Sequence, residues 1–304
     1  MRTVLNRTVT VRLLLALSLT AIFALPTLSS GSLPEADASP TPVLAQPDHA
    51  PRSGSVRILL YHHFAATEDA ATITPERLDE HLSALEQAGY PFITPSQFEA
   101  FLNGEADVPS RSVLVTIDDG YASIDDVARP ILIKHRVPAL VFLVTGQVDQ
   151  PLPGALPKLS RAQLGALAET GLFTFGGHGS NHGNPTVDGR SNLAAPYPAE
   201  PAQLFHDRVE ADLVAMQALL ASVGGRGAHF AFPYGDVSAS LDQQLVRQGV
   251  KYAYTTDEGV VTGDTDRLRL PRFNAGAGWV TGPGLVESLA GGARSYSLGS
   301  SITP

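Results

Sequence analysis

Two aspartates and two histidines carry the chemistry that this sequence offers most clearly. Asp118 and Asp119 come directly after an apolar run, and His178 and His182 come just after another. Adjacent carboxylates repel each other, so their position at the end of a buried strand indicates that both serve a metal or a proton. A solvated turn also uses Asp and Gly, but the two imidazoles favour a metal site made of one carboxylate and two histidines.

Short apolar segments alternate with amphipathic ones along the chain, which predicts strands alternating with helices. Helix starts are indicated at Thr74-Pro75, Thr94-Pro95 and Ser160. Strands are expected over residues 56–61, 112–117, 139–144, 172–175, 229–232, 252–255 and 268–270. The fold class is therefore α/β, with a parallel sheet or barrel whose functional residues gather at the carboxyl ends of the strands.

Polar clusters follow six of these seven strands, and the clusters should meet at one rim of the barrel. They are Tyr61-His62-His63, Asp118-Asp119-Gly120, His178 to His182, Phe232-Pro233-Tyr234-Gly235, Thr256-Asp257-Glu258-Gly259 and Pro271-Arg272. Two further histidines, His81 and His135, fall within predicted helices and are expected at helix surfaces or helix ends.

The N-terminal segment has the pattern of an export signal. Three arginines precede an uncharged apolar stretch, Leu13 to Leu25, which is shorter than the roughly 20 residues needed to span a bilayer. We expect a signal peptide over residues 1–30, a flexible linker over 31–55, a catalytic domain over 56–290 and a tail over 291–304. An uncleaved N-terminal anchor is the alternative. With the signal peptide removed, we expect the mature chain to have no stable membrane span and to lie outside the cell or in its envelope.

The composition restricts the possible partners. The formal net charge is -9, which disfavours nucleic acid and anionic lipid and is compatible with a neutral or cationic polymer. The chain has no cysteine, so an exported fold must be stabilised by its core, without disulfides.

Three segments, in this order, resemble the motifs of the polysaccharide deacetylases of carbohydrate esterase family 4, the NodB-homology fold. They are Thr116 to Gly120, His178 to His182 and Ala231 to Gly235. The resemblance extends over residues 56–272. It implies a distorted (β/α)7 barrel, a bound divalent metal, usually Zn²⁺, and hydrolysis of N-acetyl groups on sugars.

Two departures from the family pattern bear on the site. Many members have an arginine where this chain has Ala231, so the charge that tunes the catalytic aspartate must come from elsewhere, with Arg272 as the candidate. The second motif usually has Ser or Thr where this chain has Gly179, which should only move a loop hydrogen bond, for instance to Ser180.

A third departure narrows the subgroup. Many members take their catalytic acid from a late histidine, but no histidine follows His229 in this chain. The segment Tyr61-His62-His63-Phe64 resembles the poly-β-1,6-N-acetylglucosamine deacetylases of biofilm systems, in which an early strand supplies the acid. Because side chains alternate along a strand, only His62 or His63 can face the barrel mouth, and the resemblance favours His62.

The resemblance assigns a role to each residue. Asp119, His178 and His182 hold the metal, Asp118 is the base, and His62 protonates the leaving amine. The backbone N–H of Tyr234 faces the oxyanion, an assignment that rests on the family. Asp257 or Glu258 is expected to orient His62 and to stabilise its charged form.

The expected activity is metal-dependent removal of N-acetyl groups from an extracellular polysaccharide, with poly-β-1,6-N-acetylglucosamine as the first choice. A peptidoglycan or chitin-oligomer deacetylase is the alternative. A relative that binds a polysaccharide without cleaving it is the hypothesis of a different class, and the retention of both aspartates and both histidines argues against it.

Overall fold

The central sheet is built from the apolar runs of the chain, and all its strands are parallel. The computed structural model describes residues 53–150, 154–181 and 189–291. The strand order is β8-β7-β6-β5-β4-β1-β9. In chain order the strands are β1 (Val56–Tyr61), β4 (Ser112–Ile117), β5 (Ala139–Leu143), β6 (Phe173–Gly177), β7 (His229–Ala231), β8 (Tyr252–Tyr254) and β9 (Phe273–Asn274). A second sheet pairs β2 (His63–Phe64) with β3 (Thr72–Ile73).

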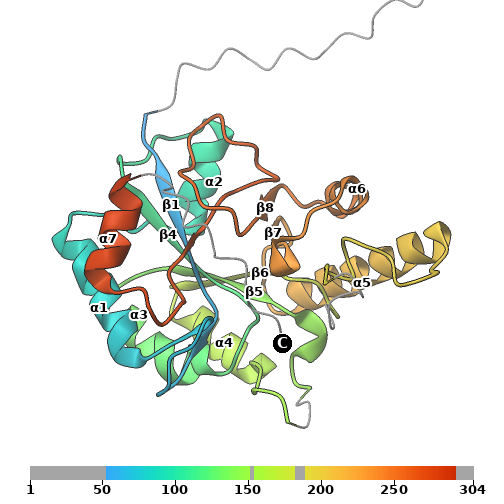
Figure 1. Ribbon diagram of the computed structural model, residues 1–304, viewed down its shortest axis with the longest axis horizontal. Helices are drawn as coiled ribbons and strands as arrows, with labels where there is room; N and C mark the ends of the chain where they lie inside the picture. Colours follow the sequence, from blue (N-terminus) through green and yellow to red (C-terminus); the bar gives the residue numbers. More distant parts are fainter. Residues whose placement is uncertain (1–52, 151–153, 182–188, 292–304) are drawn as a thin grey trace, which may run out of the picture. The chain divides into compact units, whose positions relative to one another are not determined.

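The segment before β9 links the two ends of this sheet. Leu270 forms a parallel bridge with Tyr254 of β8, and three residues later Phe273 pairs with Leu59 of β1. The sheet is therefore rolled, with helices packed on its outside (Figure 1). The predicted distorted (β/α)7 barrel is confirmed. The predicted strand over 268–270 is wrong in extent, because Leu270 alone forms a bridge there.

Seven α-helices lie within the described ranges. They are α1 (Pro75–Gln87), α2 (Pro95–Asn103), α3 (Arg129–His135), α4 (Arg161–Glu169), α5 (Ala202–Ser222), α6 (Ala239–Arg247) and α7 (Gly282–Gly291). Three begin at the predicted caps. Thr74 accepts the N–H of Arg77, whereas Thr94 and Ser160 form capping boxes. The last helix, α7, packs beside α1 (Figure 1).

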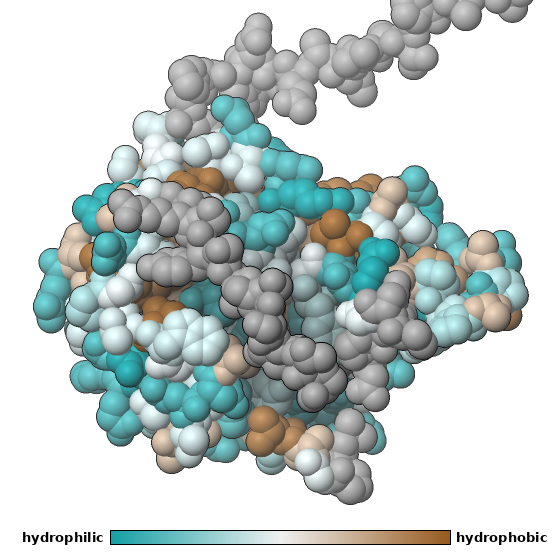
Figure 2. All heavy atoms as spheres, in the orientation of Figure 1, coloured by the Kyte–Doolittle hydropathy of each residue, from teal (hydrophilic) through white to brown (hydrophobic). Residues whose placement is uncertain are grey.

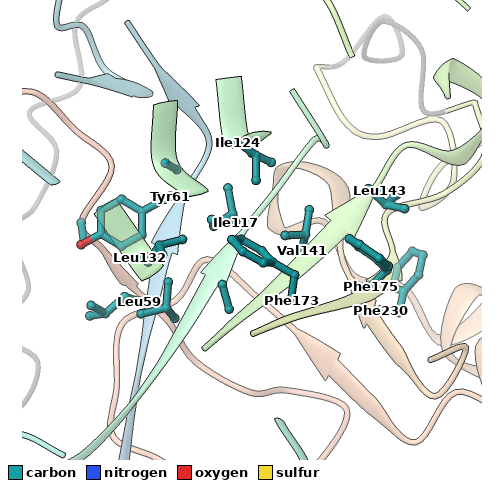
Figure 3. Packing of buried hydrophobic residues seen from close by; sticks show 14 of the residues in the cluster. Leu59, Tyr61, Ile117, Ile124, Leu132, Val141, Leu143, Phe173, Phe175 and Phe230 are labelled. Carbon is teal, nitrogen blue, oxygen red and sulfur yellow. The ribbon is translucent and has the colours of Figure 1, made fainter. Parts of the chain in front are cut away.

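Alternation along the strands divides the core into two buried clusters. On β1, Leu59 and Tyr61 face the helices, whereas Ile58 faces the interior of the barrel. Figure 3 shows the outer cluster, in which Leu59, Tyr61, Ile117, Ile124, Leu132, Val141, Leu143, Phe173, Phe175 and Phe230 pack together. Both faces of the sheet are therefore buried, which is why the strand sequences are continuous apolar runs.

His81 lies inside the protein, so the expectation of a helix-surface position is wrong for this residue. Its side chain on α1 is fully buried between Tyr61 and the segment before α7. Nε2 lies 2.9 Å from the carbonyl oxygen of Val280 and therefore donates to it, which leaves Nδ1 to accept from the Tyr61 hydroxyl at 3.2 Å. Burial lowers the pKa of His81, so the ring is neutral in the folded state.

This buried histidine predicts a loss of stability in mild acid. As the pH falls below about 6.5, the unfolded chain binds a proton that the folded chain refuses, so the stability present above that pH is lost. Between pH 7 and pH 5 the contribution reaches at most about 2 kcal/mol. Urea unfolding at both pH values should give a smaller loss for His81→Gln than for the wild type. An equal loss in the two proteins would contradict the assignment.

Large apolar side chains exposed to solvent belong to several separate elements. They are Ile133, Leu156, Tyr197, Leu204, Val214, Tyr234, Val246 and Trp279. Figure 2 shows one face of the molecule as mostly polar, with apolar residues in small separate groups. Across the described ranges, no helix combines the length and the apolar character that crossing a bilayer requires. The predicted signal peptide, most of the predicted linker (up to residue 52) and residues 292–304 of the predicted tail lie outside the described ranges.

Candidate active site

A cavity of about 420 Å³ opens at the carboxyl ends of the strands. It is lined by residues that follow β1, β4, β6, β7 and β8, together with part of the segment after β5. The lining residues are His62, Asp118, Asp119, Tyr121, Gln147, Ala155, Leu156, Lys158, His178, Phe232, Tyr234 and Thr256. The parallel sheet thus brings together clusters that lie up to about 200 residues apart in sequence.

Arg272 forms a bidentate ion pair with Asp118. Nη1 lies 2.7 Å from Oδ1 and Nη2 lies 2.8 Å from Oδ2. Nε donates to the carbonyl oxygen of Thr255 at 2.8 Å, which fixes the plane of the guanidinium. The Arg272 side chain is completely buried. The third motif has Ala231 in place of an arginine, and Arg272, directly before β9, supplies a cation to the catalytic carboxylate predicted at Asp118.

The ion pair sets the protonation state of Asp118. Burial is the largest single influence and acts to raise the pKa of this carboxyl group. Arg272 is the largest opposing influence, through its charge and its hydrogen bonds, and the pKa stays below its usual range. Asp118 is therefore ionised at neutral pH, which is the form that can accept a proton.

Asp119 and His178 form the part of the predicted metal site that the structure describes. Nδ1 of His178 lies 2.8 Å from the carbonyl oxygen of Ala231 and donates to it. The lone pair of Nε2 therefore faces Oδ1 of Asp119, at 3.5 Å. Asp119 has a φ of 70°, a left-handed conformation that costs energy in a non-glycine residue and that turns its carboxylate toward the histidine. His182 lies outside the described residues.

These groups fit a divalent cation. A neutral imidazole nitrogen and a carboxylate oxygen that face each other at 3.5 Å both present lone pairs, and a cation between them relieves the repulsion. The hydrogen bond from Nδ1 to a backbone carbonyl is the usual way in which a ligating histidine is held in one tautomer. Tyr121 adds a hydrogen bond from its side chain to Asp119.

The loop that follows His178 is held from two sides. The carbonyl oxygens of Gly179 and Ser180 accept the N–H groups of residues 145 and 146, at 3.0 and 2.9 Å. From α5, the Asp212 carboxylate accepts the N–H groups of Ser180 and Asn181, both at 2.7 Å. Gly179 has a φ of 79°, in the region that favours glycine, so a Ser or Thr at this position would be strained.

Asp212 is expected to act on metal affinity through this loop, which leads to His182. Asp212→Ala removes the acceptor of two backbone N–H groups, and outer partners of metal ligands typically contribute about 10- to 100-fold in metal affinity. Titration calorimetry with Zn²⁺ should give a dissociation constant higher by at least tenfold. Glu169→Ala, which removes an exposed carboxylate on α4, is the matched control. Unchanged zinc affinity in Asp212→Ala would refute the role.

His62 and His63 point to different surroundings. His62 lines the cavity, and its Nδ1 is buried without a hydrogen-bond partner in the described part of the chain. His63 packs its ring edge-on against Tyr121, with centroids 5.1 Å apart, and its Nδ1 lies 3.4 Å from the hydroxyl of Thr72. Alternation from Ile58, which faces the barrel interior, accounts for the inward position of His62.

Tyr234 stands at the rim of the cavity in a strained conformation. Its φ of 60° lies in the left-handed region, between Pro233 and Gly235 in the turn η3 (Pro233–Gly235). Its side chain is 54% exposed. A tight turn with a non-glycine residue at positive φ is the kind of strain that accumulates at functional sites, where it aims a backbone group.

Asp257 and Glu258 follow β8 and are exposed. The Glu258 carboxylate accepts the backbone N–H of Asn274, whereas the carbonyl oxygen of Asp257 accepts the N–H of Arg272. Neither carboxylate forms a hydrogen bond with His62, whose Nδ1 is unpaired within the described ranges. The prediction that one of them orients His62 therefore has no contact to support it.

Tyr121, Lys158 and Asp212 are site residues that the sequence reasoning missed. Tyr121 directly follows the Asp-Asp-Gly segment, and this position was the one available signal. Lys158 and Asp212 lie 39 and 93 residues after Asp119, outside any motif, and only the folding of the chain brings them to the site.

Comparison with known proteins agrees with this geometry. The polysaccharide deacetylase family matches residues 105–253, which include both aspartates and both histidines. Poly-beta-1,6-N-acetyl-D-glucosamine N-deacetylase of Staphylococcus aureus (strain MRSA252) is 23% identical over 271 residues, covering 86% of this chain and 91% of the relative. The enzyme of the same name from Staphylococcus epidermidis is 26% identical over 209 residues, covering 66% and 67%.

Among solved structures, IcaB from Ammonifex degensii is similar with a TM-score of 0.68 and 25% sequence identity, over 78% of this chain and 98% of that chain. A de-N-acetylase from Aggregatibacter actinomycetemcomitans has the same fold, with a TM-score of 0.66, 18% identity and coverage of 77% and 99%. The chain contains a polysaccharide deacetylase domain, and its enzyme class is that of a polysaccharide N-deacetylase.

Proposed function

We propose that this protein is a metal-dependent deacetylase of exported poly-β-1,6-N-acetylglucosamine. The observation that carries the proposal is the juxtaposition, in one cavity, of the Arg272-bound Asp118 carboxylate, the facing Asp119 and His178 ligands, and His62. The names of the relatives support the choice of polymer, since two staphylococcal relatives are named for this substrate.

Asp119, His178 and, from the sequence, His182 would hold the metal, with Zn²⁺ the ion that two imidazoles and a carboxylate favour. A bound divalent metal activates water and polarises a carbonyl group. Asp118 and His62, which line the same cavity and both precede these ligands in sequence, then serve as the groups that move protons.

Each remaining step uses a residue of this chain. Asp118 accepts a proton from the attacking water as the new C–O bond forms at the acetyl carbon, and Arg272 keeps Asp118 ionised beforehand. The backbone N–H of Tyr234 donates to the oxyanion that develops. His62 donates a proton to the sugar nitrogen as the C–N bond breaks, which yields acetate and a free amine.

The test is acetate release from β-1,6-linked and β-1,4-linked N-acetylglucosamine oligomers, with added zinc and with a chelator. Release from the β-1,6 oligomer that stops with the chelator and returns with zinc is the expected result. A preference for the β-1,4 oligomer would redirect the enzyme to chitin or peptidoglycan. Sugar binding without acetate release from either oligomer would favour a non-catalytic relative.

Separate replacement of His62 and of His63 should have very different effects on kcat. His62→Asn removes the proton donor that faces the cavity, so kcat should fall by about 10²- to 10³-fold. His63→Asn is the matched control and should cost much less, because its ring packs against Tyr121 outside the cavity lining. Steady-state kinetics on the β-1,6 oligomer measure both. Equal losses in the two variants would remove His62 from the mechanism.

Export of the mature domain is part of the same proposal and rests on the N-terminal arginines and the apolar stretch that follows them. Fractionation of cells that express the full chain, with sequencing of the mature N-terminus, distinguishes a cleaved signal peptide from a retained anchor. Recovery of the intact chain in the cytoplasm would refute export.

A further inference from the structure

Lys158 is a cavity residue to which the mechanism gives no task. Its backbone forms an antiparallel bridge with Tyr121. Two hydrogen bonds flank this bridge, from the N–H of Ala122 to the carbonyl of Pro157 and from the N–H of Leu159 to the carbonyl of Gly120, both of 2.8 Å. The segment that carries Lys158 is thus tied directly to the turn that carries the two aspartates.

The side chain of Lys158 is also fixed in position. Nζ lies 3.5 Å from the centroid of the Tyr121 ring, a cation–π contact that favours the charged amine. Tyr121 in turn binds Asp119 through its side chain. Burial lowers the pKa of Lys158, and the charge of Asp119 opposes this effect.

Lys158 forms no direct ion pair within the described ranges. No carboxylate oxygen there lies within ion-pair distance of Nζ, and the charge of Asp119 acts on Lys158 from beyond that distance. Lys158 therefore presents a positive charge that is not held in an ion pair to the space that the substrate would occupy. The repulsion between such a charge and a bound cation is only partly screened in a half-enclosed cavity.

The proposed reaction changes the charge of its own polymer. An N-acetylated sugar is neutral, whereas the product amine is a base that becomes an ammonium ion when protonated. We propose that Lys158 is a specificity-determining residue that favours acetylated stretches of the polymer and disfavours stretches in which a sugar next to the reacting one already carries an ammonium group. The inference rests on the proposed function, and it predicts that deacetylated sugars are spaced apart along the product.

Two defined substrates test this inference: a fully acetylated β-1,6 pentamer and the same pentamer with one glucosamine next to the reacting sugar, at a pH at which the amine is protonated. Wild type should prefer the fully acetylated pentamer by about tenfold in kcat/KM at low salt, which is the order expected for like charges a few ångströms apart. The preference should shrink in 1 M salt, where the screening length is only about 3 Å.

Three variants at this position separate charge from shape. Lys158→Arg keeps the charge and should retain the preference, whereas Lys158→Gln and Lys158→Met should reduce it to less than about twofold. Lys251→Gln is the matched control, because Lys251 is exposed and precedes β8, at the end of the strand opposite the cavity. A preference that persists in both neutral variants would overturn the inference and leave the deacetylase activity intact. If wild type deacetylates neither pentamer, the proposed function itself fails, and the inference fails with it.

Discussion

Replacement of Asp118 by Asn is expected to lower the rate of acetate release by about 10³-fold, because the amide cannot accept the proton of the attacking water. The amide still fits the site, since its oxygen can accept one of the two hydrogen bonds from Arg272. The measurement is kcat for acetate release on the β-1,6 oligomer, with zinc present at saturation.

The zinc content of Asp118→Asn decides how a loss of activity is interpreted. Asp119, His178 and His182 remain in place, so the variant should bind zinc as wild type does, and calorimetry checks this. Asp126→Asn, which changes an exposed aspartate eight residues later, should leave the rate unchanged. Persistent activity in Asp118→Asn with normal zinc content would exclude Asp118 as the base.

Removal of Arg272 should have the largest effect on stability. Arg272→Gln leaves Asp118 buried without its partner cation, and breaking a buried ion pair from one side typically costs about 3–5 kcal/mol. Urea unfolding of Arg272→Gln should therefore give a free energy of unfolding that is lower by this amount. Activity should fall as well, because the largest influence that opposes the effect of burial on the pKa of Asp118 is then lost.

A double-mutant cycle isolates the ion pair from other effects of the substitution. Asp118→Asn combined with Arg272→Gln leaves no unpaired charge in the barrel, so the double variant should be more stable than Arg272→Gln alone. Arg272→Lys keeps the charge but loses the two-pronged geometry, and it should fall between wild type and Arg272→Gln. Additive losses in the cycle would mean that the two side chains do not stabilise each other.

Much of the site followed from local patterns in the sequence. Apolar runs that end in polar residues predicted parallel strands with a functional rim. Because position 231 is alanine and not arginine, Arg272 was predicted to supply the charge beside the catalytic aspartate. These predictions succeed because the burial of a strand and the residue at which it ends both depend on consecutive residues in the sequence.

Other features depended on contacts that no local pattern contains. His81 is buried because the segment before α7 covers α1, almost 200 residues later in the chain. Asp212 reaches the histidine loop from α5, and Lys158 reaches the Tyr121 ring through an antiparallel bridge.

The sequence by itself determined the fold class, the residue types of the site and the family, because apolar periodicity and consecutive polar residues at strand ends are local properties of the chain. Only the tertiary structure decided that Arg272 forms a bidentate ion pair with Asp118 and that His62 rather than His63 lines the cavity. It also decided that Lys158 lines the cavity with the two aspartates and contacts the Tyr121 ring. The physical reason is that side-chain distances and burial depend on how the sheet curls and on which distant segments cover it.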